Sequence, residues 1–388
     1  MRILVLYSRD VERIDAGGSR AVVQLIEYLA AKDDCTVYTN FTLIGENIAY
    51  TCANWLLDSE SVLNKYVQDN HIDVIIIPEG RLYTSYARKA VKGTNCKIIS
   101  ALHSMPGYER IGIMTMLKES FHYNESRIKR LRAALFIALY PLVYIWYTLK
   151  HIFAFNRAYK DSDKLVLLSE KFFEEYKTKY YISDTSKFAA IGNAVSFNKC
   201  ADDEDLKHKK KQLLFVGRFS EECKRISLIL KAWELIYRKY PDWSLVLVGF
   251  GRSDKAYKDY VANHSLPRVS FEGKQKPESY YLNASIFLMT SAFEGWGMTL
   301  TEAQQMGCVP VAMHSFSSVT DIITDGENGF VVPNNDLNAF CERLTQLMDD
   351  KELLETMARN AVTSTERFSK EIVCEKYYKL CMQLSHSI

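Results

Sequence analysis

Short apolar strands alternate with amphipathic helices twice along this chain of 388 residues, and the repeated alternation constrains its fold most strongly. Alternation of this kind is typical of parallel sheets covered by helices on both faces. The expected strands are 2–7, 36–38, 73–77, 97–101 and 164–168 in the first run and 213–216, 244–248, 269–271, 286–289, 309–312 and 329–332 in the second. Because this length exceeds what one hydrophobic core usually serves, we predict an α/β protein with two doubly wound domains.

A polar, charge-dense segment, residues 198–211, separates the two runs and has the composition of a solvated linker or surface loop. We predict a first domain over residues 1–196 and a second over residues 197–370. Residues 371–388 are expected to form a helix that packs back toward the first domain. Ligands of doubly wound domains bind at the carboxyl ends of the strands, so a ligand between the domains would meet both sheets.

Charge and cysteine content narrow the class of protein. The formal net charge is only +2, from 49 basic and 47 acidic side chains, so bulk charge gives no support for nucleic-acid binding. The nine cysteines include no CxxC pair, which favours reduced thiols in a cytosol. The first strand follows the initiator methionine without a secretory leader, so we expect a cytoplasmic protein.

The most informative motif, residues 291–306, follows the apolar strand 286–289. It places Glu294 and Glu302 on either side of a glycine-rich turn that opens a helix. Backbone N–H groups at a helix start suit a diphosphate, and carboxylates suit sugar hydroxyls. A nucleotide sugar presents both kinds of group. The alternative is a capping box in which Glu302 only closes the helix start, but it does not account for Gly295 and Gly297.

Two cations follow the strand 213–216, namely Arg218 and Lys224. Cations at this point could neutralise the charge of a departing nucleoside diphosphate. The alternative is a pair of solvated surface cations, and the neighbouring Arg225 leaves open which side chain points inward.

In the first run, Gly17 and Gly18 lie in the segment Asp15-Ala-Gly-Gly-Ser19, which opens a helix after the first strand. Glycines let a backbone approach a ligand closely, although an ordinary loop explains them equally well. His103 ends the strand 97–101 and is either a packed residue or part of the ligand site.

Other cofactor motifs are incomplete. The segment Gly249-Phe-Gly-Arg-Ser-Asp254 begins like a dinucleotide fingerprint but lacks its third glycine. There is no GxxxxGKS or GxxxxGKT loop, no HExxH motif and no Asp-x-Asp pair in the relevant segments. We therefore expect no metal and no cofactor.

Residues 127–151 depart from the alternation. A basic stretch, Arg127 to Arg132, precedes 17 uncharged residues, 133–149, that include Pro141 and Trp146. This length is at the lower limit of a transmembrane span, which needs ~17–25 residues. The alternatives are a membrane crossing, a buried helix pair within the first domain, and a helix lying on a membrane surface.

Taken together, these motifs resemble the GT-B glycosyltransferases of family four, a retaining family that includes bacterial lipopolysaccharide, capsule and exopolysaccharide transferases. Its characteristic element is matched by Glu294 and Glu302, and its phosphate-binding cations by Arg218 and Lys224. The spacing of those two cations is one residue longer than in the commonest form of the motif. Further matches are Gly17-Gly18, His103, and residues 191–195, 307–311 and 325–330.

The resemblance implies a GT-B fold, with two Rossmann-like domains facing each other across a cleft, and a role for each motif residue. Arg218 and Lys224 would bind the diphosphate, and Glu302 the ribose hydroxyls. Glu294 and His103 would hold the transferred sugar, while Gly273 would line the base pocket. The remaining donor contacts would come from the backbone of Gly17, Gly18, Gly295, Trp296, Gly297, Met298 and Thr299.

The expected activity is transfer, with retention, of a hexose or N-acetylhexosamine from a UDP-sugar to a glycan or lipid-linked glycan. GDP-linked mannose or fucose stays open as the donor. The alternatives are a catalytically silent nucleotide-sugar-binding component of a polysaccharide assembly complex, and an epimerase or phosphorylase of the same fold. The segment 127–151 would then attach the protein to the inner face of the cell membrane.

Overall fold

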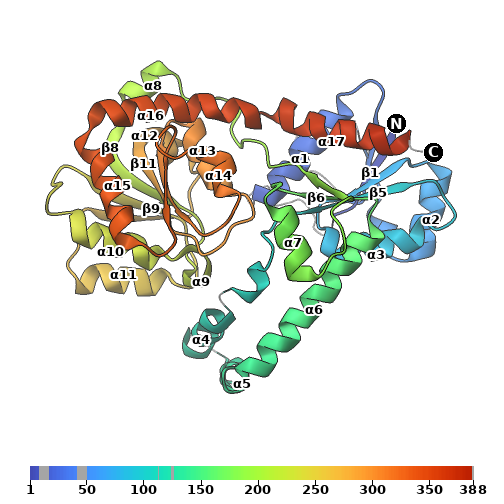
Figure 1. Cartoon of the computed structure of the whole chain (residues 1–388), viewed down its shortest axis with the longest axis horizontal. Helices are drawn as coiled ribbons and strands as arrows, with labels where there is room; N and C mark the ends of the chain where they lie inside the picture. Colours follow the sequence, from blue (N-terminus) through green and yellow to red (C-terminus); the bar gives the residue numbers. More distant parts are fainter. Residues whose placement is uncertain (8–16, 42–49, 112, 124–125, 387–388) are drawn as a thin grey trace. The chain divides into compact units, whose positions relative to one another are not determined.

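The computed structural model describes residues 1–7, 17–41, 50–111, 113–123 and 126–386. The chain divides into two compact units, each built on one parallel sheet (Figure 1). The first unit contains Met1–Pro106, Leu149–Ser196 and Arg367–Ile388, and the second contains Gly107–Thr148 and Phe197–Glu366.

The sheet of the first unit has the order β3-β2-β1-β4-β5-β6-β7, with every neighbouring pair parallel. Its strands are β1 (Arg2–Val5), β2 (Thr36–Thr39), β3 (Tyr50–Cys52), β4 (Val74–Ile77), β5 (Lys97–Leu102), β6 (Lys164–Leu167) and β7 (Phe188–Ala190). All five strands predicted in the first run are present. The sequence pattern missed β3 and β7 because three residues are too few to show a periodicity.

Helices cover both faces of this sheet because successive side chains of a strand point to opposite sides. Ile3 and Val5 pack in one core with α1 and α17, whereas Leu4 and Leu6 pack in another with α2 and α3. The helices of this unit are α1 (Gly17–Ala30), α2 (Glu60–Asp69), α3 (Gly80–Ala90), α7 (Phe172–Tyr180) and α17 (Lys370–Ser385), with the 3-10 turn η1 (Asn54–Leu57).

The sheet of the second unit has the order β10-β9-β8-β11-β12-β13 and is also parallel throughout. Its strands are β8 (Lys210–Val216), β9 (Ser244–Val248), β10 (Val269–Gly273), β11 (Ala284–Met289), β12 (Val309–His314) and β13 (Phe330–Pro333). The winding reverses between β8 and β11, as it does between β1 and β4 in the first unit. Such reversal points are where doubly wound sheets bind ligands.

The helices of the second unit surround a core that includes Trp233, Phe219 and Phe340. They are α8 (Asp203–Lys207), α9 (Glu221–Lys224), α10 (Ile226–Ile236), α11 (Asp254–Asn263), α12 (Glu278–Asn283), α13 (Met298–Gln305), α14 (Val319–Ile322), α15 (Leu337–Asp349) and α16 (Lys351–Ser364), with the 3-10 turns η2 (Tyr108–Arg110) and η3 (Thr365–Phe368) between elements.

The predicted linker, residues 198–211, is more ordered than its composition suggested. Asp202 and Asp205 form a capping box that starts α8, and β8 already begins at Lys210. The Lys209 amine donates to the Tyr281 carbonyl at 2.8 Å and to the Met306 carbonyl. Local capping and this lysine, rather than an apolar pattern, give the segment its structure.

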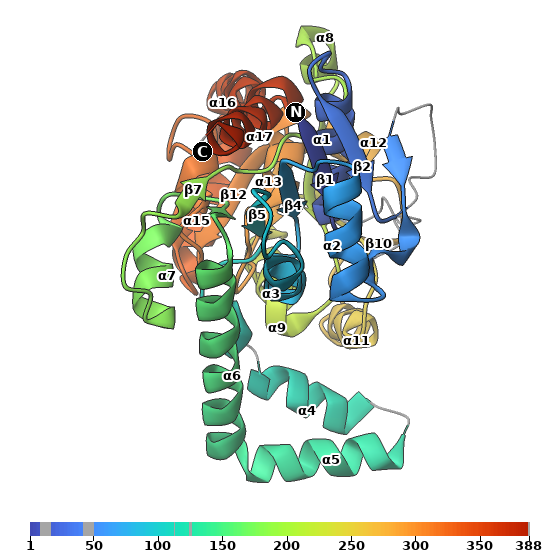
Figure 2. The same ribbon diagram turned by 90° about the vertical axis from the view of Figure 1, so that its right-hand side faces the viewer.

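Residues 113–161 form three successive helices, α4 (Ile113–Tyr123), α5 (Arg127–Ala138) and α6 (Tyr140–Asp161). Helix α5 packs on α4, and α5 and α6 meet at a bend of 92° (Figure 2). In the described part of the chain no single helix is long and apolar enough to span a membrane, although the bent pair passes by length and composition. The interpretation of 127–151 as a buried helix pair is wrong, because Leu131 and Trp146 are 74% and 59% exposed.

Candidate functional site

The predicted phosphate-binding motifs come together at the reversal point of the second unit. Because β8 and β11 are adjacent parallel strands, the loops after them share one edge of the sheet. The Ala292 N–H donates to the Cys223 carbonyl at 2.6 Å, and the Thr290 hydroxyl donates to the Lys224 carbonyl at 3.0 Å. These bonds join the end of α9 to the loop that carries Glu294.

Lys224 and Glu294 form an ion pair, with side chains only 16% and 15% exposed. The Ser291 hydroxyl donates to the same Glu294 oxygen, Oε1, at 2.6 Å. Burial alone would lower the pKa of Lys224, but the interactions with Glu294 and Cys223 together outweigh it and the pKa of Lys224 is raised. A charged amine and an oriented carboxylate therefore lie side by side, although their residues are 70 positions apart.

Arg225 has a structural role that separates it from its two neighbouring cations. Its backbone is left-handed, with φ of 48°. The guanidinium donates to the Thr290 and Ser291 carbonyls, both at 2.6 Å, and to the side chains of Asn334 and Asn335. Arg225 thus holds the β11 loop in place.

Arg218 has an exposed side chain in the loop after β8, and its charge opposes protonation of Lys224, so the two cations act on the same region.

Two glycines of the loop after β9 let it pack closely on the loop after β8. A Cβ at Gly249 would lie 1.8 Å from the Gly217 carbonyl oxygen, and one at Gly251 would lie 2.2 Å from that of Phe219. The pattern that resembled a dinucleotide fingerprint therefore serves backbone packing.

The glycine-rich turn leads directly into α13. Gly297 is the N-cap, with φ of +91° in the left-handed region, and no side chain caps the first turn. The Ser318 hydroxyl donates to the Gly295 carbonyl at 2.9 Å, and the Trp296 side chain is buried. The first amides of α13, at Met298 and Thr299, are thereby presented at a positive helix end.

Glu302 lies within α13, is 2% exposed, and accepts a hydrogen bond of 3.1 Å from the Tyr281 hydroxyl. The helix begins at Met298, so Glu302 is not its third residue and the capping-box interpretation is wrong. The two glutamates are supported by Tyr281, Ser291 and Arg225. The sequence pattern did not single out Tyr281 or Ser291 for any role, because hydroxyl donors of this kind follow no spacing rule.

Gly273 ends β10, where the pairing with β9 is irregular and φ is +68°. Its carbonyl accepts from the Gly249 N–H at 2.8 Å. Gly273 is therefore at the same carboxyl edge of the sheet, two strands away from β8.

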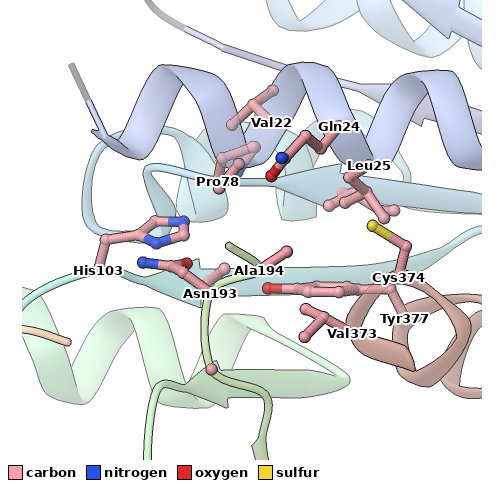
Figure 3. A pocket seen from close by; sticks show the side chains of 14 residues that line it. Val22, Gln24, Leu25, Pro78, His103, Asn193, Ala194, Val373, Cys374 and Tyr377 are labelled. Carbon is pink, nitrogen blue, oxygen red and sulfur yellow. The ribbon is translucent and has the colours of Figure 1, made fainter. Parts of the chain in front are cut away.

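In the first unit, His103 directly follows β5 and lines a small pocket with Gln24 and Asn193 (Figure 3). Burial lowers the pKa of His103, although a hydrogen bond with Asn193 opposes the shift. Within the described residues, His103 Nδ1 and Gln24 Oε1 are enclosed and have no hydrogen-bond partner. The first unit therefore presents neutral groups that can meet hydroxyls. Asn193 belongs to the 191–195 match but had not been given a role.

Gly17 and Gly18 are the first residues of α1, whereas Asp15 lies outside the described residues. These glycines belong to the first unit, whereas Arg218 and Glu294 belong to the second. The glycines and the predicted diphosphate-binding residues are therefore not neighbours within one unit.

Residues 197–363 match the family described as glycosyl transferases group 1. An uncharacterised glycosyltransferase of Haemophilus influenzae is 27% identical over 217 residues, which cover 55% of this chain and 60% of the relative. The capsular polysaccharide biosynthesis glycosyltransferase CapM of Staphylococcus aureus is 28% identical over 211 residues, which cover 50% and 55%. The chain thus spans a little over half the length of these curated relatives.

Among solved structures, Anabaena HepE in complex with UDP and glucose matches with a TM-score of 0.70 at 14% identity. The match covers 99% of this chain and all of that one. Two parallel-sheet α/β units in this order are the GT-B architecture that the sequence predicted. Residues 197–363 therefore match the glycosyl transferases group 1 family, and the chain as a whole has the GT-B fold.

Proposed function

We propose that this protein is a retaining glycosyltransferase of polysaccharide biosynthesis. It moves a hexose or N-acetylhexosamine from a nucleotide sugar, with UDP as the nucleotide, to a glycan or lipid-linked glycan acceptor. Support comes from the family of residues 197–363, from the capsular polysaccharide role in the name of CapM, and from the UDP bound to HepE.

The observation that carries the proposal is the buried Lys224–Glu294 ion pair beside the uncapped first turn of α13. A diphosphate would bind to Lys224, Arg218 and the α13 amides, since these groups donate hydrogen bonds or carry positive charge. Glu294 would then accept a hydroxyl of the sugar, and Glu302 a ribose hydroxyl. One edge of the sheet thus offers positive potential for phosphate and acceptors for a polyol.

In the proposed reaction, the bond between the anomeric carbon and the β-phosphate oxygen breaks as the acceptor hydroxyl bonds the same face of that carbon. The departing phosphate oxygen takes the hydroxyl proton, so the products are a nucleoside diphosphate and a glycoside of unchanged anomeric configuration. Arg218 and Lys224 stabilise the charge that grows on the leaving group, and metal independence rests on these two cations. Product NMR and activity in EDTA test retention and metal independence separately.

Glu302→Gln tests donor binding while nearly preserving side-chain volume. Losing a charged hydrogen-bond acceptor costs about 1.5–3 kcal/mol, so UDP affinity should fall roughly 10- to 100-fold by calorimetry. Glu234→Gln is the matched control, because Glu234 also accepts from a tyrosine hydroxyl, that of Tyr260, but between α10 and α11. Equal UDP affinity in wild type and Glu302→Gln would contradict the assigned site.

A second candidate function is a silent nucleotide-sugar-binding component. It predicts the same effect of Glu302→Gln on binding but no turnover, so slow release of nucleotide from the donor separates it from an enzyme. A thermal-shift panel of UDP- and GDP-linked sugars ranks the donors, because a ligand of the folded state raises the melting midpoint according to its affinity.

A further inference from the structure

The longest run of exposed apolar side chains lies on α5 and α6, outside the site described above. Among the described residues, nine of the fifteen exposed large apolar side chains fall between Ile128 and Phe153. A soluble surface rarely gathers so many large apolar groups in one short segment, and such patches mark interaction sites.

On α5 the exposed groups form one stripe. Ile128, Leu131 and Leu135 are spaced by three and four residues, so they share one face of the helix, and they are 81%, 74% and 55% exposed. The opposite side is the one that packs on α4, where the Arg130 Nε donates to the Phe121 carbonyl at 3.0 Å and Ala133 is buried. The helix therefore packs the side with Arg130 and Ala133 on α4 and leaves its leucine face uncovered.

On α6 the pattern continues with Leu142, Ile145, Trp146, Leu149 and Phe153, which share one face of the helix and are 49% or more exposed. From His151 onward the opposite face of the helix is buried, through His151, Phe155, Ala158 and Tyr159.

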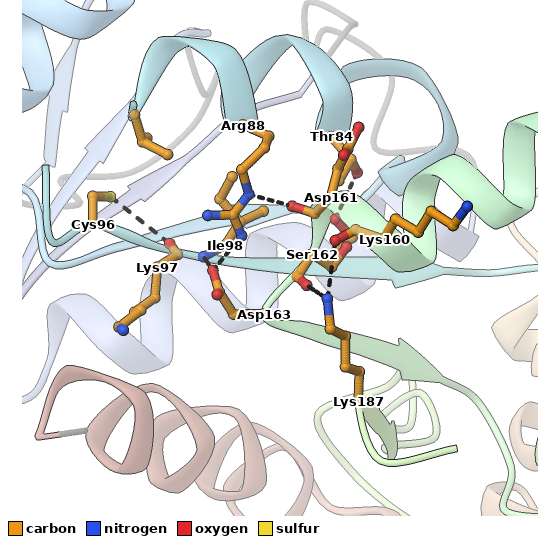
Figure 4. Close-up of polar contacts among 12 residues, drawn as sticks. Thr84, Arg88, Cys96, Lys97, Ile98, Lys160, Asp161, Ser162, Asp163 and Lys187 are labelled. Carbon is orange, nitrogen blue, oxygen red and sulfur yellow. Dashed lines mark hydrogen bonds and ion pairs between the residues drawn. The ribbon is translucent and has the colours of Figure 1, made fainter. Parts of the chain in front are cut away.

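The end of α6 is held independently of the exposed stripe (Figure 4). The Lys187 amine donates to the carbonyls of Lys160 and Ser162 at 2.9 and 2.8 Å. The Arg88 Nε donates to the Asp161 carbonyl at 2.7 Å. Substitution of exposed stripe residues should therefore leave the fold of α6 intact.

The charge around the stripes indicates what covers them. Residues 127–150 carry five basic and no acidic side chains, although the whole chain has a net charge of only +2. Arg127, Lys129 and Arg132 are all exposed on α5. Two copies pairing through this surface would oppose like charges, which disfavours self-association. An anionic bilayer instead accepts apolar groups and attracts basic ones.

We propose that these apolar stripes, with Arg127, Lys129 and Arg132, are a docking surface for an anionic lipid bilayer. The helices lie at the interface, with the aliphatic side chains of the stripes at the level of the acyl chains and Trp146 at the headgroups. This inference does not rest on the proposed transferase activity, since it concerns vesicle binding alone. It places the protein at a membrane face, where a lipid-linked acceptor would also be found.

Sedimentation of the full chain with vesicles tests the proposal, using phosphatidylcholine alone and with about a quarter phosphatidylglycerol. Each basic residue contributes roughly fivefold near an anionic surface, so the triple variant Arg127→Glu/Lys129→Glu/Arg132→Glu should bind anionic vesicles at least about 100-fold more weakly. The matched control reverses Lys65, Lys255 and Lys351, which are exposed on α2, α11 and α16. It makes the same change in net charge and should bind like wild type.

A second pair of variants tests the apolar stripes. Leu131→Gln/Trp146→Gln should lose at least about tenfold in vesicle binding, because two apolar side chains that would be buried in the bilayer are replaced by polar ones. Leu235→Gln/Phe250→Gln removes two exposed apolar groups elsewhere, at 63% and 58% exposure, and should bind as wild type does. Release by 1 M salt is expected, since attachment is electrostatic in part.

The proposal would be overturned if the wild-type chain did not bind anionic vesicles, if both charge variants bound equally, or if binding resisted salt and alkaline extraction as for a spanning helix. Concentration-dependent dimers that dissociate in Leu131→Gln/Trp146→Gln would instead identify an interface between copies and would also overturn it.

Discussion

In the second unit a lysine–glutamate ion pair lies where the loops after β8 and β11 meet. The first unit repeats the reversed winding between β1 and β4, yet its pocket presents the imidazole of His103 with the amides of Gln24 and Asn193. The same topology thus carries charged groups in one unit and mainly neutral ones in the other.

This difference follows from what each unit has at its strand ends. The second unit has Arg218 and Lys224 after β8 and an uncapped helix start after β11, so positive potential accumulates there. In the first unit burial lowers the pKa of His103, which keeps the ring neutral near pH 7. On the proposed function, the charged nucleotide would thus be bound by the second unit, whereas the first unit would contribute neutral hydrogen-bonding groups, and the predictions below test that division.

The largest effect is expected for Lys224→Met. Loss of one preorganised cation at a developing phosphate charge should lower kcat/KM by about 100- to 1,000-fold. It also leaves the Glu294 carboxylate buried without its partner, which should cost about 3 kcal/mol of stability. Steady-state kinetics and calorimetry measure the two effects.

The double variant Lys224→Met/Glu294→Gln should recover stability but not activity, since the buried charge is gone and the cation is still missing. Lys211→Met is the control: its partner Asp242 is 54% exposed, so a change within ~1 kcal/mol and normal turnover are expected. Full activity in Lys224→Met would contradict the role assigned to the charged groups of the second unit.

His103→Gln should affect turnover without affecting the nucleotide. Removal of a positioned hydrogen-bonding group should lower kcat about 100-fold, while UDP affinity measured by calorimetry stays within about twofold. The control is His264→Gln, because His264 is exposed on the second unit and stacks on Tyr260. A large loss of UDP affinity in His103→Gln would assign nucleotide binding to the first unit as well.

Gly297→Ala sharpens the role of the α13 turn. Both Gly297 and Gly326 have left-handed backbones, with φ of +91° and +81°, so alanine at either should cost about 1–2 kcal/mol. A Cβ at Gly297 would approach Leu300 Cδ1 at 3.2 Å, whereas one at Gly326 meets nothing within 4 Å. Only Gly297→Ala should weaken UDP binding, by roughly tenfold. Equal UDP affinities of Gly297→Ala and Gly326→Ala would show that the turn is not part of the site.

Much of the fold could be predicted because strand and helix periodicities are local properties of the sequence. The order of the strands could not, since it depends on which strands pair across distant parts of the chain. Helix α8 was missed because a capping box and the buried Lys209 amine, rather than apolar spacing, stabilise residues 202–211.

Glu294, Glu302, Arg218 and Lys224 could be singled out from the sequence because the segments that carry them follow the strands β8 and β11. The ion pair between Lys224 and Glu294 depends on the pairing of β8 with β11, and no spacing rule encodes it. The role of Arg225 depends on its left-handed backbone, which is unusual for a residue with a side chain and could not be expected.

The smallest expected effect is a pair of opposite pH dependences. The pKa of His103 is lowered below 6.5, so the unfolded chain binds this proton more tightly, and His103 costs stability as pH falls below about 6.5. The pKa of Lys224 is raised above 10.5, so its contribution is complete below that value and is lost as pH rises beyond it. In calorimetric melts, His103→Gln should reduce the loss of stability at acid pH. Lys224→Met/Glu294→Gln should reduce the loss of stability at alkaline pH. If His103→Gln instead changed stability at alkaline pH, or the double variant changed it at acid pH, the assignment of charged and neutral chemistry to the two units would be reversed.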